Sequence, residues 1–363
     1  MTCTRDYGVH FAGVDLKVSG LAFQQQDLGV SRCATVALWC ALHKVGERET
    51  IATLTPADIT NLASRHRLPF GRSMPSEGLA VDQLCLAIES VGVSPYLAMV
   101  PSVERGRSLI YSATLSHMPC ILIMQKVGAE RDWHAVTVAG IKLASVHAPC
   151  YVGGSKVAGD DLSGDMKALY VHDDRVGPYC RVDINGTDPN ALHLSINTQG
   201  HVKGAIPEDW VIRNVLIPTH SKIRVSFNDL RTICVDWLIA EIQSVIANEQ
   251  CKSPGDLDAV QFKYWIERGH EYSRRVLTEQ LLTKEKGISL CKTYVMPRYV
   301  GVIRFISSAF GQIDVLMDTT SPRPNYNWIG VVARHTDDES GRLRHIVGEY
   351  LAECCQCQDQ YFS

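Results

Sequence analysis

Residues 24–38 read QQQDLGVSRCATVAL, and this stretch decides how the first half of the chain is expected to fold. Its apolar residues recur at three- and four-residue spacing, which predicts a helix over about 31–45. Ser31 is the expected N-cap, so Cys33 would lie in the first turn. Backbone amides and the helix dipole favour a thiolate there. We therefore take Cys33 as the candidate nucleophile, whereas a buried structural thiol is the alternative and the expectation for Cys40.

Three consecutive glutamines, Gln24, Gln25 and Gln26, precede this helix. A glutamine amide upstream of a nucleophile can donate to a developing oxyanion, together with the backbone N–H of Cys33. We prefer Gln26 for this oxyanion role and keep Gln25 as the alternative. A polar, solvated loop is the competing interpretation of the run.

Two further residues complete the candidate constellation. His134 begins an alternating apolar stretch over about 134–142, which predicts a strand with the imidazole at its start. Asp173 ends the next predicted strand, where its carboxylate can accept the imidazole N–H, and Asp174 is the alternative. A rim histidine and an Asp-Asp turn are the purely structural interpretations. The order of these four residue types along the chain predicts a Cys33–His134–Asp173 triad.

The remaining pattern predicts an α+β protein in two domains, residues 1–190 and 191–363. In the first domain we expect further helices at about 55–66 and 81–91, and strands at about 96–100, 119–125 and 168–172. In the second domain we expect helices at about 227–248, 256–268, 271–284 and 341–353, and strands at about 300–306, 312–317 and 328–333.

From about residue 21 to residue 182 the chain resembles the bacteriocin-processing, double-glycine-leader branch of the papain-like cysteine peptidases. The resemblance rests on a glutamine and an acidic residue before the cysteine helix, and on the segments GLAVDQL (78–84), MPCILI (118–123), HAVTVAG (134–140) and YVHD (170–173). It implies a papain-like domain with a helical half, an antiparallel sheet half and the active site between them. It also implies that the enzyme cleaves peptide bonds. Arg32 and Ala34 depart from the usual aspartate and glycine, which puts the substrate preference in doubt.

The composition argues against some classes of binding partner. The formal charge is −3 and the pI about 6.5, so no basic excess points to nucleic acid or to an anionic membrane surface. No signal peptide or membrane span is recognisable, so we expect a cytoplasmic location. The 13 cysteines are expected to be reduced thiols. Cys354, Cys355 and Cys357 lack a full set of zinc ligands nearby, so neither a metal nor a cofactor is expected.

The sequence therefore predicts a cysteine peptidase acting on a protein or peptide substrate. An acyltransferase or transglutaminase-like enzyme on the same fold is one alternative, and a catalytically inactive peptide-recognition module is another. The C-terminal domain is expected to bind a regulatory or substrate-presenting protein. The Gly-, Ser- and Asp-rich insertion over about 143–167 is expected to lengthen a hairpin beside His134 and Asp173, as a lid or as a plain solvent loop.

Overall fold

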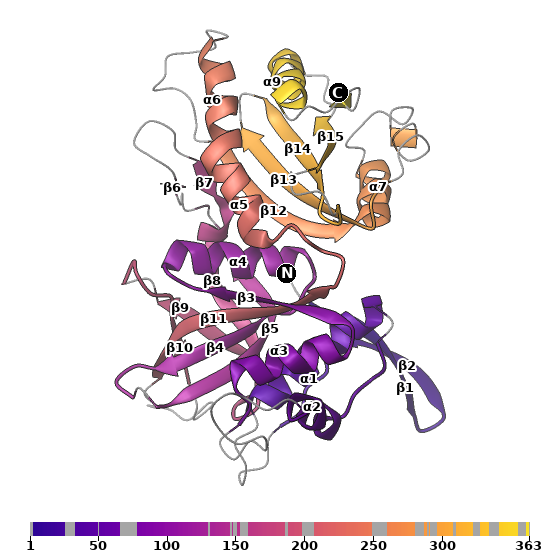
Figure 1. Ribbon diagram of the computed structural model, residues 1–363, viewed down its shortest axis with the longest axis vertical. Coiled ribbons are helices and arrows are strands. Elements are labelled where there is room, and N and C mark those ends of the chain that lie inside the picture. The colour runs from indigo at the N-terminus through magenta and orange to yellow at the C-terminus, as the bar shows by residue number, and fades with distance from the viewer. Residues whose placement is uncertain are drawn as a thin grey trace. The chain divides into compact units, whose positions relative to one another are not determined.

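A computed structural model of the chain forms two compact units (Figure 1). It describes residues 3–25, 33–49, 51–65, 78–129, 131–145, 147, 151–152, 159–185, 188–197, 207–248, 260–279, 287–288, 290, 296–307, 310–321, 327–333, 341–354 and 361–362. The first unit comprises residues 1–147 and 165–221, and the second comprises residues 148–164 and 222–363.

The first unit is built around a closed antiparallel barrel. Its six strands are β4 (Ile121–Lys126), β5 (Trp133–Leu143), β8 (Met166–Asp173), β9 (Gly177–Asn185), β10 (His193–Ile196) and β11 (Glu208–His220). Strand β10 pairs with both β9 and β11, which closes the barrel, and β3 (Val93–Met99) is added outside β11. Closure leaves no unpaired edge among the six strands.

Helices pack on this barrel through small and branched side chains. The helices are α1 (Cys33–Glu49), α2 (Pro56–Ala63), α3 (Val81–Ser90) and α4 (Val103–Leu115). Ala34, Ala37 and Leu38 of α1 share a buried cluster with Ala135 of β5. Small alanines let the helix backbone approach the strand closely, so the N-terminus of α1 is held near the start of β5.

Two strands, β1 (Arg5–Phe11) and β2 (Val14–Gly20), form a separate antiparallel hairpin at the beginning of the first unit. The hairpin extends away from the helices of this unit (Figure 1).

The second unit is a mixed sheet with helices. Its strands run in the order β16 (Tyr361–Phe362), β15 (Asn327–Ala333), β14 (Gly311–Asp318), β13 (Tyr299–Ser307), β12 (Val260–Arg268), β7 (Gly159–Asp161) and β6 (Tyr151–Val152). Its helices are α5 (Phe227–Ile233), the π-helical turn η2 (Cys234–Leu238), α6 (Ile239–Asn248), α7 (Gly269–Thr278) and α9 (Gly341–Cys354), while the short 3-10 helix η1 (Leu162–Asp165) follows β7.

The α+β class expected from the sequence is confirmed, and most predicted elements are present within a few residues of their expected bounds. One prediction is wrong: residues 260–268 form strand β12, not part of a helix over 256–268. Val260, Phe262 and Tyr264 are buried at alternate positions, which is the strand period, and β12 lies between β13 and β7. The sequence pattern also missed the β1–β2 hairpin, α4, and strands β9 to β11.

The domain boundary also differs from the expected position near residue 190. Strands β10 and β11 complete the barrel of the first unit, so that unit continues to Ser221. The insertion does not lie beside His134 and Asp173, because it joins the opposite ends of β5 and β8, at Leu143 and Met166. Its strands β6 and β7 belong to the sheet of the second unit.

Among the residues that the structure describes, no helix combines the length and the apolar composition that a membrane span requires.

Candidate active site

The site is organised around Cys33, the first residue of α1. This residue is partly exposed. The amides of the first helical turn have no partners within the helix and favour an anion at this end. Burial raises the thiol pKa of six further cysteines: Cys3, Cys40, Cys85, Cys120, Cys180 and Cys234. For Cys40 on the same helix, the pKa rises to about 12, as expected of a structural thiol.

His134 lies between Cys33 and the end of strand β8. It is the second residue of β5, pairs with Met124 of β4, and is only 4% exposed. Burial alone would lower the pKa of its imidazole, but interactions with Asp173 and with Cys33 raise that pKa to about 9. The ring is therefore protonated at neutral pH, which is the state needed beside a thiolate.

Asp173 is the carboxylate nearest to this ring. Its Oδ1 lies 3.1 Å from Nε2 of His134, although the ring N–H is not well aligned with any acceptor. Such hydrogen bonds often tighten only when substrate binds. Burial would raise the pKa of Asp173, but His134 and Arg175 together lower it, so this carboxylate is ionised. Since Nε2 faces Asp173, the Nδ1 nitrogen is the one left to face the sulfur of Cys33.

Arg175 fixes the position of this carboxylate. Its backbone N–H donates to Oδ1 of Asp173 over 2.9 Å, and its guanidinium Nε lies 3.6 Å from the same oxygen. The tight turn after β8 thus holds Asp173 toward the histidine.

Asp174 occupies a different environment from Asp173. Its Oδ1 is 3.8 Å from Nε2 of His134, and neither of its carboxylate oxygens has a hydrogen-bond partner. Burial raises its pKa, and the charge of Asp173 adds to this effect. The geometry therefore favours Asp173 over Asp174 as the orienting group.

His134, Asp173 and Asp174 offer ligand atoms within 4.8 Å of one another, close enough to hold a metal ion. A metal on Nε2 would displace the proton that this nitrogen directs at Asp173, so metal binding and the triad geometry exclude each other. The Cys355 and Cys357 positions considered from the sequence lie outside the described residues.

The sequence pattern missed one residue that shapes the site, Trp210 of β11. Its ring centroid lies 5.6 Å from that of His134, and the guanidinium of Arg175 lies over the indole at 5.2 Å. The indole is 1% exposed and shields the imidazole from water. No local signal places Trp210 here, because β11 reaches the site only by pairing with β4.

A hydrogen bond ties the strand of the histidine to the helix of the cysteine. The hydroxyl of Thr137 in β5 donates to the carbonyl of Ala37 in α1 over 2.6 Å, and the contact is buried. Thr137 is three residues after His134, and Ala37 is one helical turn after Cys33. This bond therefore limits sliding of one element past the other.

Two of the three glutamines lie in the described part of the chain. Gln26 lies outside the described residues, and Gln25 and Gln24 are exposed. The segment just before them is attached to strands β8 and β9. The backbone N–H of Leu21 donates to the hydroxyl of Tyr179 over 2.6 Å, and Nδ1 of His172 donates to the carbonyl of Ala22 over 3.2 Å. The approach to α1 is thus fixed to the strand that carries Asp173.

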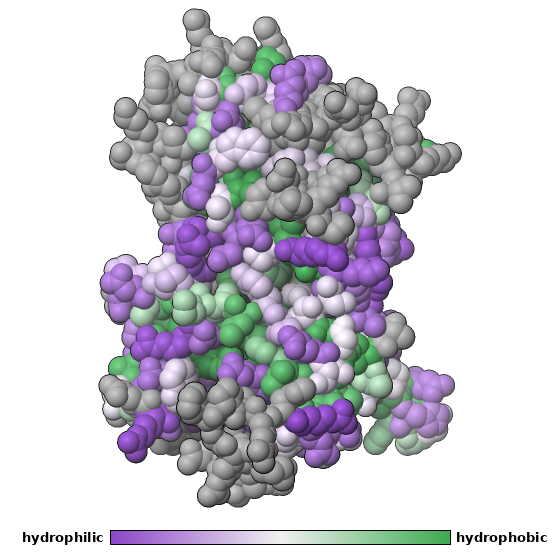
Figure 2. Space-filling view, in the orientation of Figure 1, coloured by the Kyte–Doolittle hydropathy of each residue, from purple (hydrophilic) through white to green (hydrophobic). Residues whose placement is uncertain are grey.

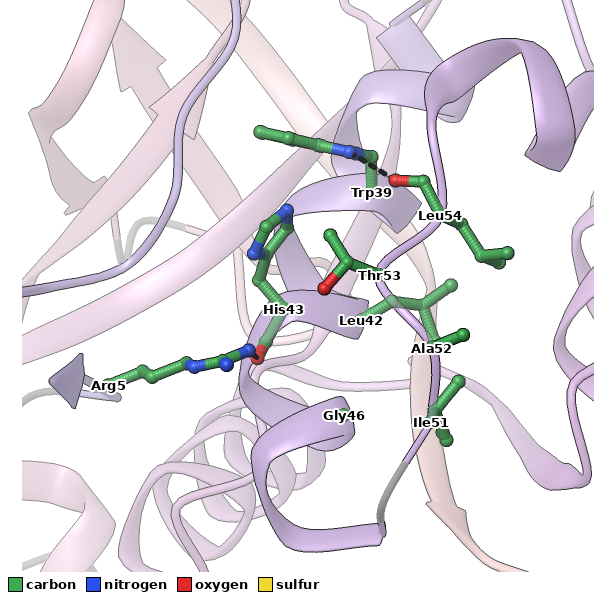
Figure 3. A pocket seen from close by; sticks show the side chains of 9 residues that line it. All are labelled: Arg5, Trp39, Leu42, His43, Gly46, Ile51, Ala52, Thr53 and Leu54. Carbon is green, nitrogen blue, oxygen red and sulfur yellow. Dashed lines mark hydrogen bonds between the residues drawn. The ribbon is translucent and has the colours of Figure 1, made fainter. Parts of the chain in front are cut away.

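A small pocket elsewhere on α1 is separate from this site (Figure 3). It lies along the C-terminal half of the helix, and it has room for about one water molecule. Within it, Trp39 donates to the carbonyl of Leu54 over 2.8 Å, and Arg5 donates to the carbonyl of His43 over 2.9 Å. These contacts attach a loop and strand β1 to α1, and the pocket is too small for a substrate.

Comparison with known proteins assigns this arrangement to no family: no family model matches the chain, and no curated protein matches it.

Proposed function

We propose that the first unit is a cysteine peptidase with Cys33 as nucleophile, His134 as general base and acid, and Asp173 as the group that orients His134. The observation that carries this proposal is the position of one buried imidazole. It interacts with a helix-terminal thiol on one side and with an ionised carboxylate on the other. The proposal agrees with the resemblance over residues 21–182, which rests in part on the segments that carry these same residues.

In the proposed reaction, Cys33 acts as a thiolate beside the protonated ring of His134, and the thiolate attacks the carbonyl carbon of a peptide bond. The backbone N–H of Cys33 donates to the resulting oxyanion, with Gln26 as the proposed second donor. The imidazolium then gives its proton to the leaving amine, and the carbon–nitrogen bond breaks. His134 next takes a proton from the water that attacks the thioester, and collapse of this second intermediate releases the acid and regenerates the thiolate beside the protonated ring.

The buried carboxylate contributes by holding the positive charge of the imidazolium. Asp173 raises the pKa of His134 and so stabilises the imidazolium that must stand beside a Cys33 thiolate. Trp210 excludes water from the contact between the two side chains, which strengthens their attraction.

The proposal is tested by alkylating the full-length native protein with limiting iodoacetamide, and by following each cysteine by mass spectrometry from pH 5 to 9. We expect Cys33 to react much faster than Cys85, a half-buried cysteine on α3 that serves as internal reference. His134→Ala should slow Cys33 alkylation at neutral pH by at least about tenfold, since thiolate stabilisation is then lost. His43→Ala, on α1 but remote from the sulfur, is the matched control and should leave the rate unchanged.

Equal alkylation of Cys33 in the wild type and in His134→Ala would contradict the proposal. If Cys33 instead proves reactive and depends on His134, the protein should be assayed on a peptide library, with Cys33→Ala as the inactive control. Incorporation of a labelled amine without hydrolysis would indicate an acyltransferase on the same site.

A further inference from the structure

The β1–β2 hairpin has one apolar face that is largely exposed beyond Tyr7, whose ring lies near that of His43 in α1. The strand register pairs Phe11 with Val14, Val9 with Leu16, and Tyr7 with Val18, so all six side chains lie on the same face. The five aliphatic and phenylalanine side chains of this set are 40% to 70% exposed. Both hydrophobic and hydrophilic atoms are visible over the hairpin at the lower right of Figure 2. Contiguous exposed apolar side chains of this kind mark interaction surfaces.

The opposite face of the hairpin carries ionisable side chains that form two cross-strand pairs. Lys17 pairs with Asp6 at 2.8 Å, and His10 pairs with Asp15 at 2.6 Å. The hairpin is therefore an amphipathic two-stranded ribbon, and a ribbon of two strands is only marginally stable by itself in water.

The base of the ribbon is attached to the first unit, whereas the edge of β2 is free. Arg5 at the start of β1 donates to the carbonyl of His43 in α1, and Leu21 after β2 donates to Tyr179. Among the described residues, no strand pairs with the outer edge of β2.

The turn determines which backbone groups this edge presents. Ala12 and Gly13 form a two-residue turn with φ of 49° and 82°, as in a type I′ hairpin. Phe11 and Val14 are then a hydrogen-bonded pair, and alternation makes Leu16 bond inward to Val9. The amide and carbonyl groups of Asp15 and Lys17 consequently point outward and are available to another strand.

We propose that β2 pairs edge to edge with β2 of a second copy of this chain, antiparallel, about a two-fold axis that passes through Leu16. In this register Asp15 of each copy lies opposite Lys17 of the other, so two pairs of opposite charge form. On the other face, Leu16 meets its own copy and Val14 meets Val18. The sequence of β2 is thus complementary to itself in charge and in apolar character.

The pairing produces a four-stranded sheet in place of two isolated ribbons. It satisfies the outward amides and carbonyls of both β2 strands, and it brings the apolar side chains of the two copies side by side. Each opposite-charge or apolar cross-strand pair contributes about 0.2–1 kcal/mol. A closed two-fold arrangement is also the commonest form of soluble homo-oligomer.

Cross-linking tests the register directly in the full-length protein. Leu16→Cys places two thiols opposite each other at a non-hydrogen-bonded pair, where Cβ atoms are about 4.5–5.5 Å apart. Mild oxidation should therefore give a covalent dimer, with a disulfide between the two introduced thiols identified by peptide mass spectrometry. Val18→Cys is the matched control: it faces Val14 of the other copy, so it should form no more than about a tenth as much dimer.

Charge reversal tests the complementarity by sedimentation velocity at low salt. Asp15→Lys and Lys17→Asp each place like charges opposite each other twice, and each should raise the dimer dissociation constant about tenfold. The double variant restores opposite pairs and should return the constant to near the wild-type value. Because these residues are exposed, folding should be little affected.

A wild type that stays monomeric at all concentrations would overturn the proposal, as would equal cross-linking of the two cysteine variants. Failure of the double variant to recover dimerisation would overturn the β2 register. Coverage of the ribbon by another segment of the same chain or by a different protein would appear as one of these outcomes. None of these measurements depends on peptidase activity.

Discussion

Replacing Asp173 with asparagine should remove a pH-dependent part of the stability of the barrel. Asparagine has nearly the same shape and can still accept the hydrogen bond from the backbone of Arg175, but it carries no charge. A pKa of about 9 for His134 in the folded protein, against 6.5 for an ordinary histidine, corresponds to about 3 kcal/mol of folding free energy.

The sign follows from the direction of this shift. Because the pKa of His134 is raised by folding, the stabilisation is fully present below pH 6.5 and is lost as the pH rises through about 9. In Asp173→Asn the imidazole loses its anionic partner, burial lowers its pKa, and this loss of stability between pH 6.5 and 9.5 should largely disappear.

Hydrogen exchange of β5 amides, read by mass spectrometry, is a suitable assay because it reports opening of the barrel separately from the second unit. Wild type and variant are compared at each pH, so the intrinsic pH dependence of exchange cancels when reclosing is fast. Asp174→Asn is the matched control and should keep the wild-type slope. It should also raise stability at neutral pH by roughly 1 kcal/mol, since it removes a buried carboxylate without hydrogen-bond partners. The same pH slope in wild type and Asp173→Asn would refute the assigned ion pair.

Three further changes probe other parts of the structure. Thr137→Val should cost about 1 kcal/mol of barrel stability and slow alkylation of the nucleophile, whereas Thr137→Ser should preserve both; equal alkylation rates would show that the hydrogen bond to α1 has no positioning role. Gly159→Ala would bring a Cβ to 2.3 Å from the Ile239 side chain. It should therefore lower the free energy of unfolding of the second unit by about 1–3 kcal/mol in thermal unfolding, while hydrogen exchange of β5 stays constant. Arg304→Met should destabilise the second unit by about 3–5 kcal/mol in urea, and adding Asp314→Leu should recover most of the loss, because the two form a buried two-point ion pair; no recovery would argue against it.

The candidate site could be predicted from the sequence because each of its residues has a local signature. A helix start identifies Cys33, a strand start identifies His134, and a strand end identifies Asp173. The structure brings these three together, whereas their catalytic roles stay predictions. The preference between Asp173 and Asp174 could not be settled from the chain alone, since it depends on how the turn at Arg175 directs each carboxylate.

Other features depend on partners that are distant in the sequence. The segment 260–268 contains apolar residues compatible with either a helix or a strand, and its pairing with β7, about a hundred residues earlier, accompanies the strand state. The place of Trp210 beside the imidazole likewise follows from pairing of β11 with β4. Closure of the barrel through β10 and β11 has the same origin, which is why the expected boundary near residue 190 fell inside it.

The strands β6 and β7 link the two units in sequence, because they lie within the sequence of the first unit but belong to the sheet of the second. Residues 148–164 leave the barrel between β5 and β8 and supply the border of a sheet whose other strands come after residue 222. A chain cut after Ser221 keeps the whole barrel but carries two orphaned strands, and a fragment starting at Lys222 lacks the neighbour of β12. The second unit is therefore not a module that could be exchanged by joining sequences end to end. During synthesis, β7 is made about a hundred residues before β12, the strand with which it pairs. A sequence change in residues 148–164 therefore affects a sheet whose other strands are synthesised later.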